Sequence, residues 1–351
     1  MPAVTTPDIL ALPRVDAPAV EALPRRVGVV VDSQRALEGA GFPVRRPTAD
    51  PRVWDALDPI LMLDHMIAAY EPHEAKGAPW HPHRGFETVT YLMDGVFVHT
   101  DSHGGGGVIA DGDTQWMTAG SGLLHDELPS EHLVMNGGEF DGIQMWVNLP
   151  ARAKMHAPRY QDIKGQGLTL LTSADGGTLI RVIAGRIGEY EGPGSTFSPI
   201  NLVHLSLAPG AQVRVPWVPG WSGMAYSLHG DGFVGDDRRP LGESQMAVFS
   251  KDGNYLTVEA AGEQHHKTGA MEVILFGGEP IREPVARYGP FVMNTKEEIY
   301  QAMEDFRSGR MGQIPAGHEG RDYAPAPEEF NNPSNQGCEI LFGPQWRGEG
   351  A

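Results

Sequence analysis

Two short motifs constrain this chain more than any other feature of its sequence. The first is His81-Pro82-His83, and the second is His125-Asp126-Glu127. Side chains at positions i and i+2 of a β-strand point to the same face of a sheet, so each motif presents two polar side chains together. Pairing the two segments inside a small barrel would bring three imidazoles and one carboxylate to one point. We therefore predict one site assembled from two strands that are distant in the sequence.

The chemistry of this set of side chains indicates a metal ion. Three nitrogens and one oxygen suit a divalent transition metal such as Fe, Mn, Ni, Cu, Zn or Co, whereas Ca²⁺ and Mg²⁺ would need more oxygen ligands. Four protein ligands leave two open positions on an octahedral ion, and open positions are what catalysis requires. A lone histidine is usually a hydrogen-bonded residue, but two i, i+2 pairs of ligand-type residues favour a metal site over coincidence. The predicted ligands are His81, His83, His125 and Glu127.

Composition narrows the fold class and the kinds of partner. The 351 residues include 45 glycines and 29 prolines, and long helical patterns are few, which favours an all-β protein of two domains. The net charge of −18 would repel phosphate backbones, so we expect no nucleic-acid partner. The single cysteine, Cys338, excludes an internal disulfide and suits a reducing compartment. Neither a secretory signal nor a membrane span is visible in the sequence, so we expect a cytoplasmic protein.

Strand patterns divide the chain into consecutive parts. Residues 1–25 are predicted to be a flexible arm, and residues 26–150 a first barrel that carries the metal site. Within it, strands at 88–93 and 96–100 flank Asp94-Gly95, which predicts a hairpin. Residues 151–312 contain regularly spaced strands without a His-x-His motif, so we predict a second, metal-free barrel.

The C-terminal part contains the clearest helix of the sequence. Residues 295–308 begin with a capping box, Thr295 with Glu298, and carry the apolar positions Ile299, Met303 and Phe306 at helical spacing. We expect this stripe to pack on a barrel. Residues 313–351 are predicted to form an extended surface tail, and its expected anchors are Phe330, Leu341, Phe342 and Trp346.

Longer motifs resemble a known family. His-x-His-x-x-x-Glu, then a turn glycine and a later histidine, resembles the two motifs of cupins. The stretches that resemble pirins in particular are His81-Pro82-His83-Arg84-Gly85-Phe86-Glu87-Thr88-Val89-Thr90-Tyr91-Leu92, Asp113-Thr114-Gln115-Trp116-Met117-Thr118-Ala119-Gly120-Ser121-Gly122-Leu123-Leu124-His125, Gln144-Met145-Trp146-Val147-Asn148-Leu149-Pro150 and Tyr288-Gly289-Pro290-Phe291-Val292-Met293-Asn294-Thr295. The resemblance spans residues 26–312 and implies two cupin-type barrels, that is, a bicupin, with a short C-terminal helix.

The resemblance also implies the metal and its ligands. In pirins the iron ligands are the two histidines of His-x-His and the histidine and glutamate of His-x-Glu, which correspond here to His81, His83, His125 and Glu127. Glu87 shares the parity of the first two histidines, and in many cupins the glutamate of the first motif is a ligand. We favour Glu127, with Glu87 as a neighbour of the ligands or a spare ligand. Asp126 departs from the small residue that the family pattern leads us to expect.

Two functions follow from the resemblance. One is a metal-dependent dioxygenase that uses Fe(II) and O2 to open the ring of a flavonol such as quercetin, with Glu127 or Glu87 as the base for the substrate hydroxyl. The other is a redox-responsive iron protein that regulates transcription or metabolic enzymes through protein contacts. We favour the enzyme, and we expect it to be a monomer with a small aromatic substrate. Phe86, Met93, Met145 and Trp146 are the candidates for an apolar pocket lining, and His65, His73 and His103 are candidate pocket histidines.

Overall fold

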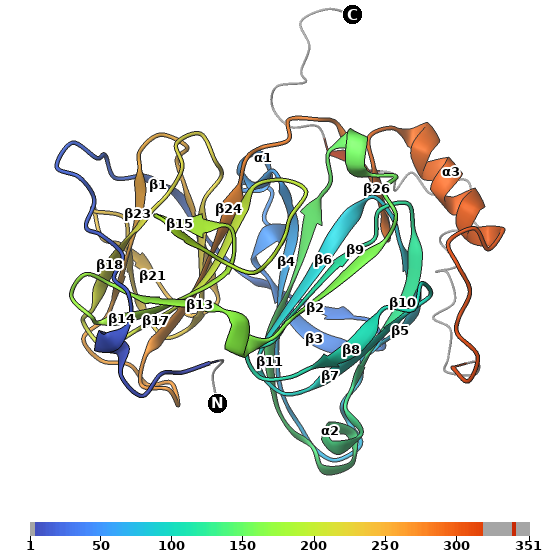
Figure 1. Ribbon diagram of the computed structural model, residues 1–351, viewed down its shortest axis with the longest axis horizontal. Helices are drawn as coiled ribbons and strands as arrows, with labels where there is room; N and C mark the ends of the chain where they lie inside the picture. Colours follow the sequence, from blue (N-terminus) through green and yellow to red (C-terminus); the bar gives the residue numbers. More distant parts are fainter. Residues whose placement is uncertain (1–3, 319–338, 342–351) are drawn as a thin grey trace, which may run out of the picture. The chain divides into compact units, whose positions relative to one another are not determined.

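A computed structural model describes residues 4–318 and 339–341 of the chain (Figure 1). The chain forms two compact units, each built from interleaved segments. We call the unit that carries the two motifs the histidine unit; it comprises Arg35–Val44, Asp64–Asp162 and Ile281–Ala351. The other, here the aliphatic unit, comprises Met1–Gln34, Arg45–Leu63 and Ile163–Pro280.

This interleaving differs from the consecutive domains 26–150 and 151–312 that the strand patterns suggest. Strand β1 (Val27–Asp32) pairs with β22 (Gln245–Phe249), so the first strand of the chain belongs to the aliphatic unit. The C-terminal strands and helix, from Ile281 onward, belong to the histidine unit. Alternating apolar and polar residues predict that a segment is a strand. They do not predict its partner strand, because pairing depends on contacts between segments distant in the sequence.

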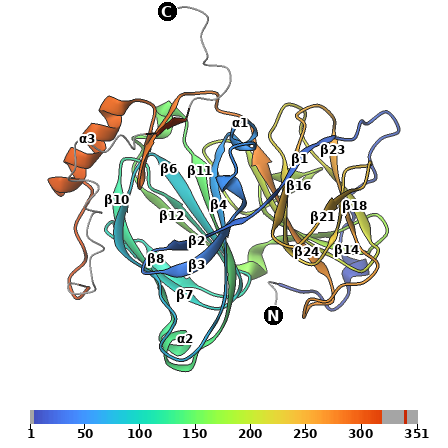
Figure 2. The ribbon, with the colours of Figure 1, turned by 180° about the vertical axis from the view of Figure 1, so that it is seen from behind.

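Two sheets face each other in the histidine unit (Figures 1 and 2). The seven strands of the larger sheet are, in spatial order, β12 (Arg159–Ile163), β9 (Thr114–Thr118), β6 (Phe86–Asp94), β11 (Gly138–Asn148), β4 (Ile60–Tyr70), β3 (Phe42–Arg46) and β2 (Gln34–Glu38). The four strands of the smaller sheet are β5 (Ala78–His83), β10 (Leu123–Pro129), β7 (Phe97–Asp101) and β8 (Gly106–Ile109). Helix α2 (Glu131–Asn136) lies between β10 and β11 in the chain.

The turn at Asp94-Gly95 joins these two sheets and does not close a hairpin. Strand β6 pairs with β9 and β11, whereas β7 pairs with β8 and β10. The predicted hairpin is therefore wrong, although both strands exist. Gly95 has φ of 111°, and a Cβ there would lie 2.6 Å from the Phe140 ring. The glycine lets the backbone turn the corner of the barrel beside a buried aromatic side chain.

A second corner, at Arg84-Gly85, carries the chain from β5 to β6. Gly85 has φ of 88°, and a Cβ on it would lie 1.9 Å from the Val292 carbonyl oxygen. This close approach belongs to strand β26 (Phe291–Met293), which bridges to Arg84. The buried Lys154 Nζ donates to Gly85 O at 2.7 Å, Asn148 Oδ1 at 2.6 Å and Val292 O at 3.0 Å. One ammonium group thus ties together three segments that meet next to the first histidine motif.

The predicted C-terminal helix is present as α3 (Lys296–Arg307), outside the sheets in both views (Figures 1 and 2). Its capping box between Thr295 and Glu298 is confirmed. Ile299 is buried against β25 (Val285–Tyr288) and β26, while Met303 and Phe306 pack on the same cluster. Asp305 accepts from Arg84 Nη1 at 2.8 Å. Burial raises the pKa of Asp305, but hydrogen bonds from Arg84, Gln301 and Arg310 outweigh that effect and lower the pKa to about 2. A third strand, β27 (Glu339–Leu341), pairs with β25.

The aliphatic unit is built from one large sheet and two smaller ones. Its larger sheet consists of β1, β22, β19 (Met224–His229), β24 (Met271–Gly278), β17 (Ile200–Leu207), β14 (Thr178–Ala184) and β13 (Thr169–Thr172). Its smaller sheets consist of β18 (Gln212–Pro216), β23 (Tyr255–Ala260), β20 (Gly232–Val234) and β21 (Arg239–Leu241), and of β15 (Arg186–Ile187) with β16 (Tyr190–Glu191). The interior between the sheets is made of aliphatic side chains with Trp217 and Phe249. Helix α1 (Trp54–Leu57) belongs to this unit.

The N-terminal arm is attached to the aliphatic unit along much of its length. Arg14 bridges to Thr172 in β13, and Val15 is buried in the apolar core. Arg181, itself buried, donates from Nε to the carbonyl of Val4 at 2.8 Å. Residues 4–25, predicted to be a flexible arm, therefore contact the aliphatic unit at several points that side-chain periodicity does not reveal. Most of the predicted tail, with the expected anchors Phe330, Phe342 and Trp346, lies outside the described residues. No helix in the described part of the chain has the length and apolar character needed to cross a membrane.

Replacing Lys154 with methionine tests the corner described above. We expect Lys154→Met to lower the free energy of unfolding by about 3 kcal/mol, because three buried acceptors would lose their donor. Urea unfolding followed by fluorescence measures this change, and Lys76→Met, at an exposed lysine, is the matched control. Equal unfolding midpoints for the two variants would contradict the assigned role of Lys154.

Candidate metal centre

The smaller sheet of the histidine unit presents both motifs on one face. His81 on β5 lies opposite His125 on β10, and a bulge follows, so that Glu127 lies opposite Ala78. On the other side of β10, strand β7 places Asp101 opposite His125 and His99 opposite Glu127. Directly opposed residues of antiparallel strands share a face, so six polar side chains line this inner face. They are His81, His83, His99, Asp101, His125 and Glu127.

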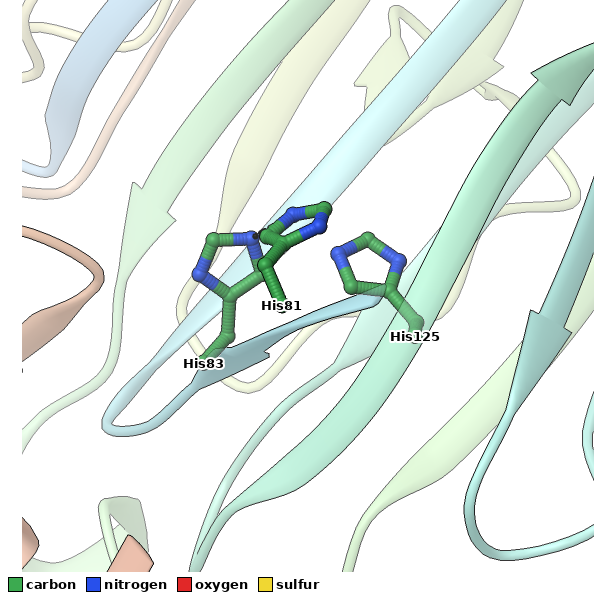
Figure 3. A group of neighbouring side chains, drawn as sticks. All are labelled: His81, His83 and His125. Carbon is green, nitrogen blue, oxygen red and sulfur yellow. Dashed lines mark hydrogen bonds between the residues drawn. The ribbon is translucent and has the colours of Figure 1, made fainter. Parts of the chain in front are cut away.

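Three of the predicted ligands converge. Figure 3 shows the rings of His81, His83 and His125 pointing toward one another. One ring nitrogen from each lies within 4.8 Å of the others. The Nε2 atoms of His81 and His83 are 3.0 Å apart. Two neighbouring nitrogens that each lie about 2.1 Å from an octahedral ion are about 3.0 Å apart. The spacing of the two rings therefore fits a shared metal ion.

Hydrogen bonds at the opposite ring nitrogens fix the tautomers. His81 Nδ1 lies 2.8 Å from the Pro79 carbonyl oxygen, and His83 Nδ1 lies 3.3 Å from that of Pro290. A carbonyl can only accept, so both Nδ1 atoms carry the proton and both Nε2 atoms present lone pairs. Two lone pairs that face each other across 3.0 Å repel unless a cation lies between them. His125 adds a buried Nε2 that has no hydrogen-bond partner. These unprotonated nitrogens fit a metal ion, and this fit is the strongest feature of the site.

The environment keeps the imidazoles neutral, which metal ligation requires. Burial, together with the neighbouring His81, lowers the pKa of His83 well below its ordinary value. Burial lowers the pKa of His125 in the same way, and His81 and His83 add to the effect. His83 and His125 are buried, whereas His81 is partly exposed, so solvent reaches the group from the His81 side.

Glu127 lies beside the three histidines without joining their group. Its Oε1 accepts from Thr90 Oγ1 at 3.1 Å and from Gln115 Nε2 at 3.0 Å, and its Oε2 accepts from Gln144 Nε2 at 2.7 Å. Ligand-type atoms of Glu127, His125 and His99 form a second group within 4.8 Å. His125 is thus common to both groups, and the carboxylate is held by the sheet that faces the histidines.

Glu87 occupies the opposite face of its sheet. It accepts from Thr118 Oγ1 at 2.6 Å, whereas Thr90, three residues later on β6, points to Glu127. The inward orientation that shared parity allows for Glu87 is not found, because parity holds only within one uninterrupted strand and the corner at Arg84-Gly85 lies between. Burial raises the pKa of Glu87 to about 7.

Aromatic side chains cover the His83 side of the group. The ring centroids of His83 lie 5.0 Å from Phe86 and 5.3 Å from Trp146. Arg287 from β25 lies over the Trp146 ring at 4.7 Å. Phe86 and Trp146, two of the four expected lining residues, therefore contact the predicted ligand His83.

The remaining sequence candidates lie elsewhere. Met93 and Met145 alternate with the inward positions of β6 and β11 and belong to the other face. His73 and His103 are exposed, and the buried His65 bonds Asp141 at 2.9 Å instead.

Sequence reasoning missed several residues of the site. His99 and Asp101 surround His125, while Gln115, Gln144 and Thr90 hold Glu127. The spacing of His99 and Asp101, two residues apart on a predicted strand, was a usable signal because it repeats the i, i+2 pattern of the ligand motifs. The glutamines carried no comparable signal, since their role depends on the facing sheet.

The fold and the histidine group together define an all-β protein of two cupin-type units with a candidate metal site in one of them. Comparison with known proteins gives the family. Residues 41–147 match the family model described as Pirin, and residues 202–312 match Pirin C-terminal cupin domain.

The chain is 38% identical over 286 residues to a Pseudomonas aeruginosa protein named "Putative quercetin 2,3-dioxygenase", a match that covers 81% of this chain and 97% of that one. It is 37% identical over 290 residues to human Pirin, covering 82% and 94% of the two chains. The 1.88 Å crystal structure of quercetin 2,3-dioxygenase from Acinetobacter baumannii is similar with a TM-score of 0.76 and 36% identity, covering 83% of this chain and 99% of that one. The chain belongs to the pirin family.

The buried Glu87 makes stability depend on pH. Its pKa is raised from 4.5 to about 7, so the folded state holds the proton over a range in which the unfolded state has lost it. This contribution is complete below pH 4.5 and is lost as pH rises through about 7. Glu87→Gln should remove that loss, so its stability relative to the wild type should rise by up to about 3 kcal/mol between pH 4.5 and 8. Unfolding curves of both metal-free proteins measure this, and curves that stay parallel across that range would contradict the assignment.

Proposed function

We propose that this protein is a pirin-type dioxygenase that holds Fe(II) at His81, His83, His125 and Glu127 and opens the ring of a small aromatic substrate such as quercetin. The observation that carries the proposal is the convergence of unprotonated imidazole nitrogens on one point. The substrate class rests on the names of the related proteins. Other divalent metals fit the same donor atoms, so iron is the proposed occupant among Fe, Mn, Ni, Cu, Zn and Co.

The bound metal would supply two open positions at which O2 and the deprotonated hydroxyl of the substrate are brought together. The histidines hold the ion through Nε2, and the Nδ1 protons of His81 and His83 are fixed by the carbonyls of Pro79 and Pro290. Glu127 is the proposed fourth ligand and the proposed acceptor of the hydroxyl proton. Both its oxygens have partners, and a change at the single contact to Gln144 frees Oε2. We propose that this freed Oε2 is the atom of Glu127 that binds the ion.

The apolar side of the group suits an aromatic ligand that carries negative charge. Phe86 and Trp146 lie with their ring centroids 4.4 Å apart next to His83. The Arg287 guanidinium over Trp146 adds a positive charge on this side. A flavonol that has lost its hydroxyl proton offers both an extended ring system and an anionic oxygen. We propose that these three side chains orient such a substrate.

Aerobic loss of the quercetin absorbance band tests the enzyme directly. Protein stripped of metal and reloaded with Fe(II) should turn over quercetin, and the apoprotein should not. His125→Ala should lose both the metal and the turnover, because it removes a ligand. Tight Fe(II) binding by the wild type without turnover would refute the dioxygenase and retain the metal centre.

Glu127→Gln separates the roles of the two buried glutamates. We expect the turnover of this variant to fall by about 10²-fold or more, because the substitution removes the proposed base and weakens binding of the metal ion. Glu87→Gln is the matched control. It makes the same change on the face of β6 that points away from the histidines, so turnover should stay within about twofold of the wild type. Undiminished turnover in Glu127→Gln would remove this residue from the proposed mechanism.

A second function is favoured by the contacts that link the metal site to the surface. Arg84, next to His83, bonds Asp305 on α3, and Pro290 next to β26 accepts from His83. A change in iron oxidation state would alter the charge at His83. Through Arg84 and Asp305, that change would shift the position of α3. We propose this link as the basis of the alternative, a redox-responsive protein that binds partners through this helix.

The alternative is tested by partner capture. Fe(II)-loaded and Fe(III)-loaded protein should retain different partners, and Arg84→Met should reduce that difference because it uncouples α3. Identical partners for both oxidation states and for His125→Ala would refute the redox switch.

A further inference from the structure

His99 lies at the centre of contacts that neither the sequence motifs nor the family resemblance assigns. It is buried on β7, opposite Glu127, and its Nδ1 lies 3.3 Å from Nδ1 of His125. A hydrogen bond between two imidazole nitrogens needs one proton, so one ring donates and the other accepts. Which ring holds that proton decides which nitrogen of His125 is left for a metal ion.

The metal site requires one of the two arrangements. His125 Nε2 is buried without a hydrogen-bond partner, and it can bind an ion only as a lone pair. The proton of neutral His125 must then lie on Nδ1, where it is donated to His99. His99 accepts at Nδ1 and carries its own proton on Nε2. The reverse arrangement would protonate His125 Nε2 and exclude it as a ligand.

The surroundings of His99 favour the accepting arrangement. Its Nε2 has no hydrogen-bond partner and lies 3.9 Å from Asp101 Oδ2, so a carboxylate lies near this nitrogen. Asp101 is fixed by the backbone N–H groups of His103 at 2.7 Å and Gly105 at 2.9 Å. Burial raises the pKa of Asp101, but the neighbouring His99 side chain and these two backbone hydrogen bonds outweigh it and lower the pKa, so the carboxylate stays charged. A negative charge on the Nε2 side stabilises His99 with its proton there.

Tyr160 holds the His99 ring in place. The two rings are stacked with centroids 5.1 Å apart and planes 14° apart. The Tyr160 hydroxyl donates to Gln115 Oε1 at 3.4 Å, and Gln115 in turn donates to Glu127. Burial raises the pKa of Tyr160 above its ordinary value, which keeps the hydroxyl a donor. The His99 ring, which accepts the hydrogen bond from His125, is thus fixed by the same contacts through Tyr160 and Gln115 that hold Glu127.

We infer that His99 is a positioning residue that fixes His125 as the Nδ1–H tautomer and so leaves its Nε2 free to bind the metal. This inference rests on the proposed metal centre. The other three-residue group, His99, His125 and Glu127, is then the support of the site and no separate ion position. Each ligand histidine has its own acceptor at Nδ1, which is Pro79 O for His81, Pro290 O for His83 and His99 for His125.

Three variants separate hydrogen bonding from packing. His99→Phe keeps a ring that can stack on Tyr160 and removes the acceptor. His99→Asn places an amide oxygen near the position of Nδ1 and retains the acceptor. His132→Phe makes the matched change at an exposed histidine on α2.

The affinity of the metal-free proteins for Co(II) is measured by competition with a chelator. We expect His99→Phe to lower the affinity by about 10- to 100-fold, as is typical when the partner of a ligand histidine is removed. His99→Asn and His132→Phe should stay within about threefold of the wild type, because both keep an acceptor for His125. An unchanged affinity in His99→Phe would overturn the inference. A loss in His99→Asn as large as that in His99→Phe would also overturn it, since packing alone would then explain both.

A second readout needs no metal. The ¹⁵N chemical shifts of labelled histidine rings distinguish the two tautomers, and His125 is assigned from its missing signals in His125→Ala. The wild type should show His125 protonated at Nδ1, and His99→Phe should show a shift toward the Nε2–H form. An unchanged His125 tautomer in His99→Phe would overturn the inference. Failure of the wild type to bind Co(II) would refute the metal centre itself, which is a separate result from any difference between the variants.

Discussion

The pairing of β5 with β10 is the interaction on which the rest of the site depends. It sets His81 opposite His125, and the bulge that follows turns the strand so that Glu127 still shares their face. A shift of one residue in this register would send all of these side chains to the other face of the sheet. The facing sheet then adds what backbone pairing cannot supply, because Thr90, Gln115 and Gln144 fix the carboxylate by direct hydrogen bonds.

Orientation of the rings comes from three separate parts of the chain. Pro79 acts within its own strand, Pro290 reaches in from the C-terminal segment, and His99 belongs to the neighbouring strand. Each supports one imidazole at the nitrogen that faces away from the common point. This arrangement leaves the lone pairs directed at one another in the metal-free protein, an electrostatic cost that a bound cation removes.

Much of the fold and part of the site could be predicted from the sequence. The i, i+2 spacing located His81, His83 and His125, and the capping box located α3, because both are local patterns with a fixed geometric meaning. Strand partners could not be predicted in the same way. Three features depend on contacts between distant segments. Strand β1 pairs within the aliphatic unit, the chain passes from one sheet to the other at Gly95, and Glu87 faces away from the histidines. The roles of His81, His83, His125 and Glu127 as metal ligands remain predictions.

The hydrogen bond between His83 and the Pro290 carbonyl determines when the site can be completed during synthesis. The two residues are separated by 207 positions, and Gly85 next to them packs against Val292. A nascent chain that has emerged only through the second motif therefore holds both motifs but lacks the carbonyl that fixes His83 and the strand that closes its corner. Domains generally fold from the N-terminus as the ribosome releases them. In this protein the order is constrained differently, since the complete arrangement of histidines can form only after almost the whole chain has been translated.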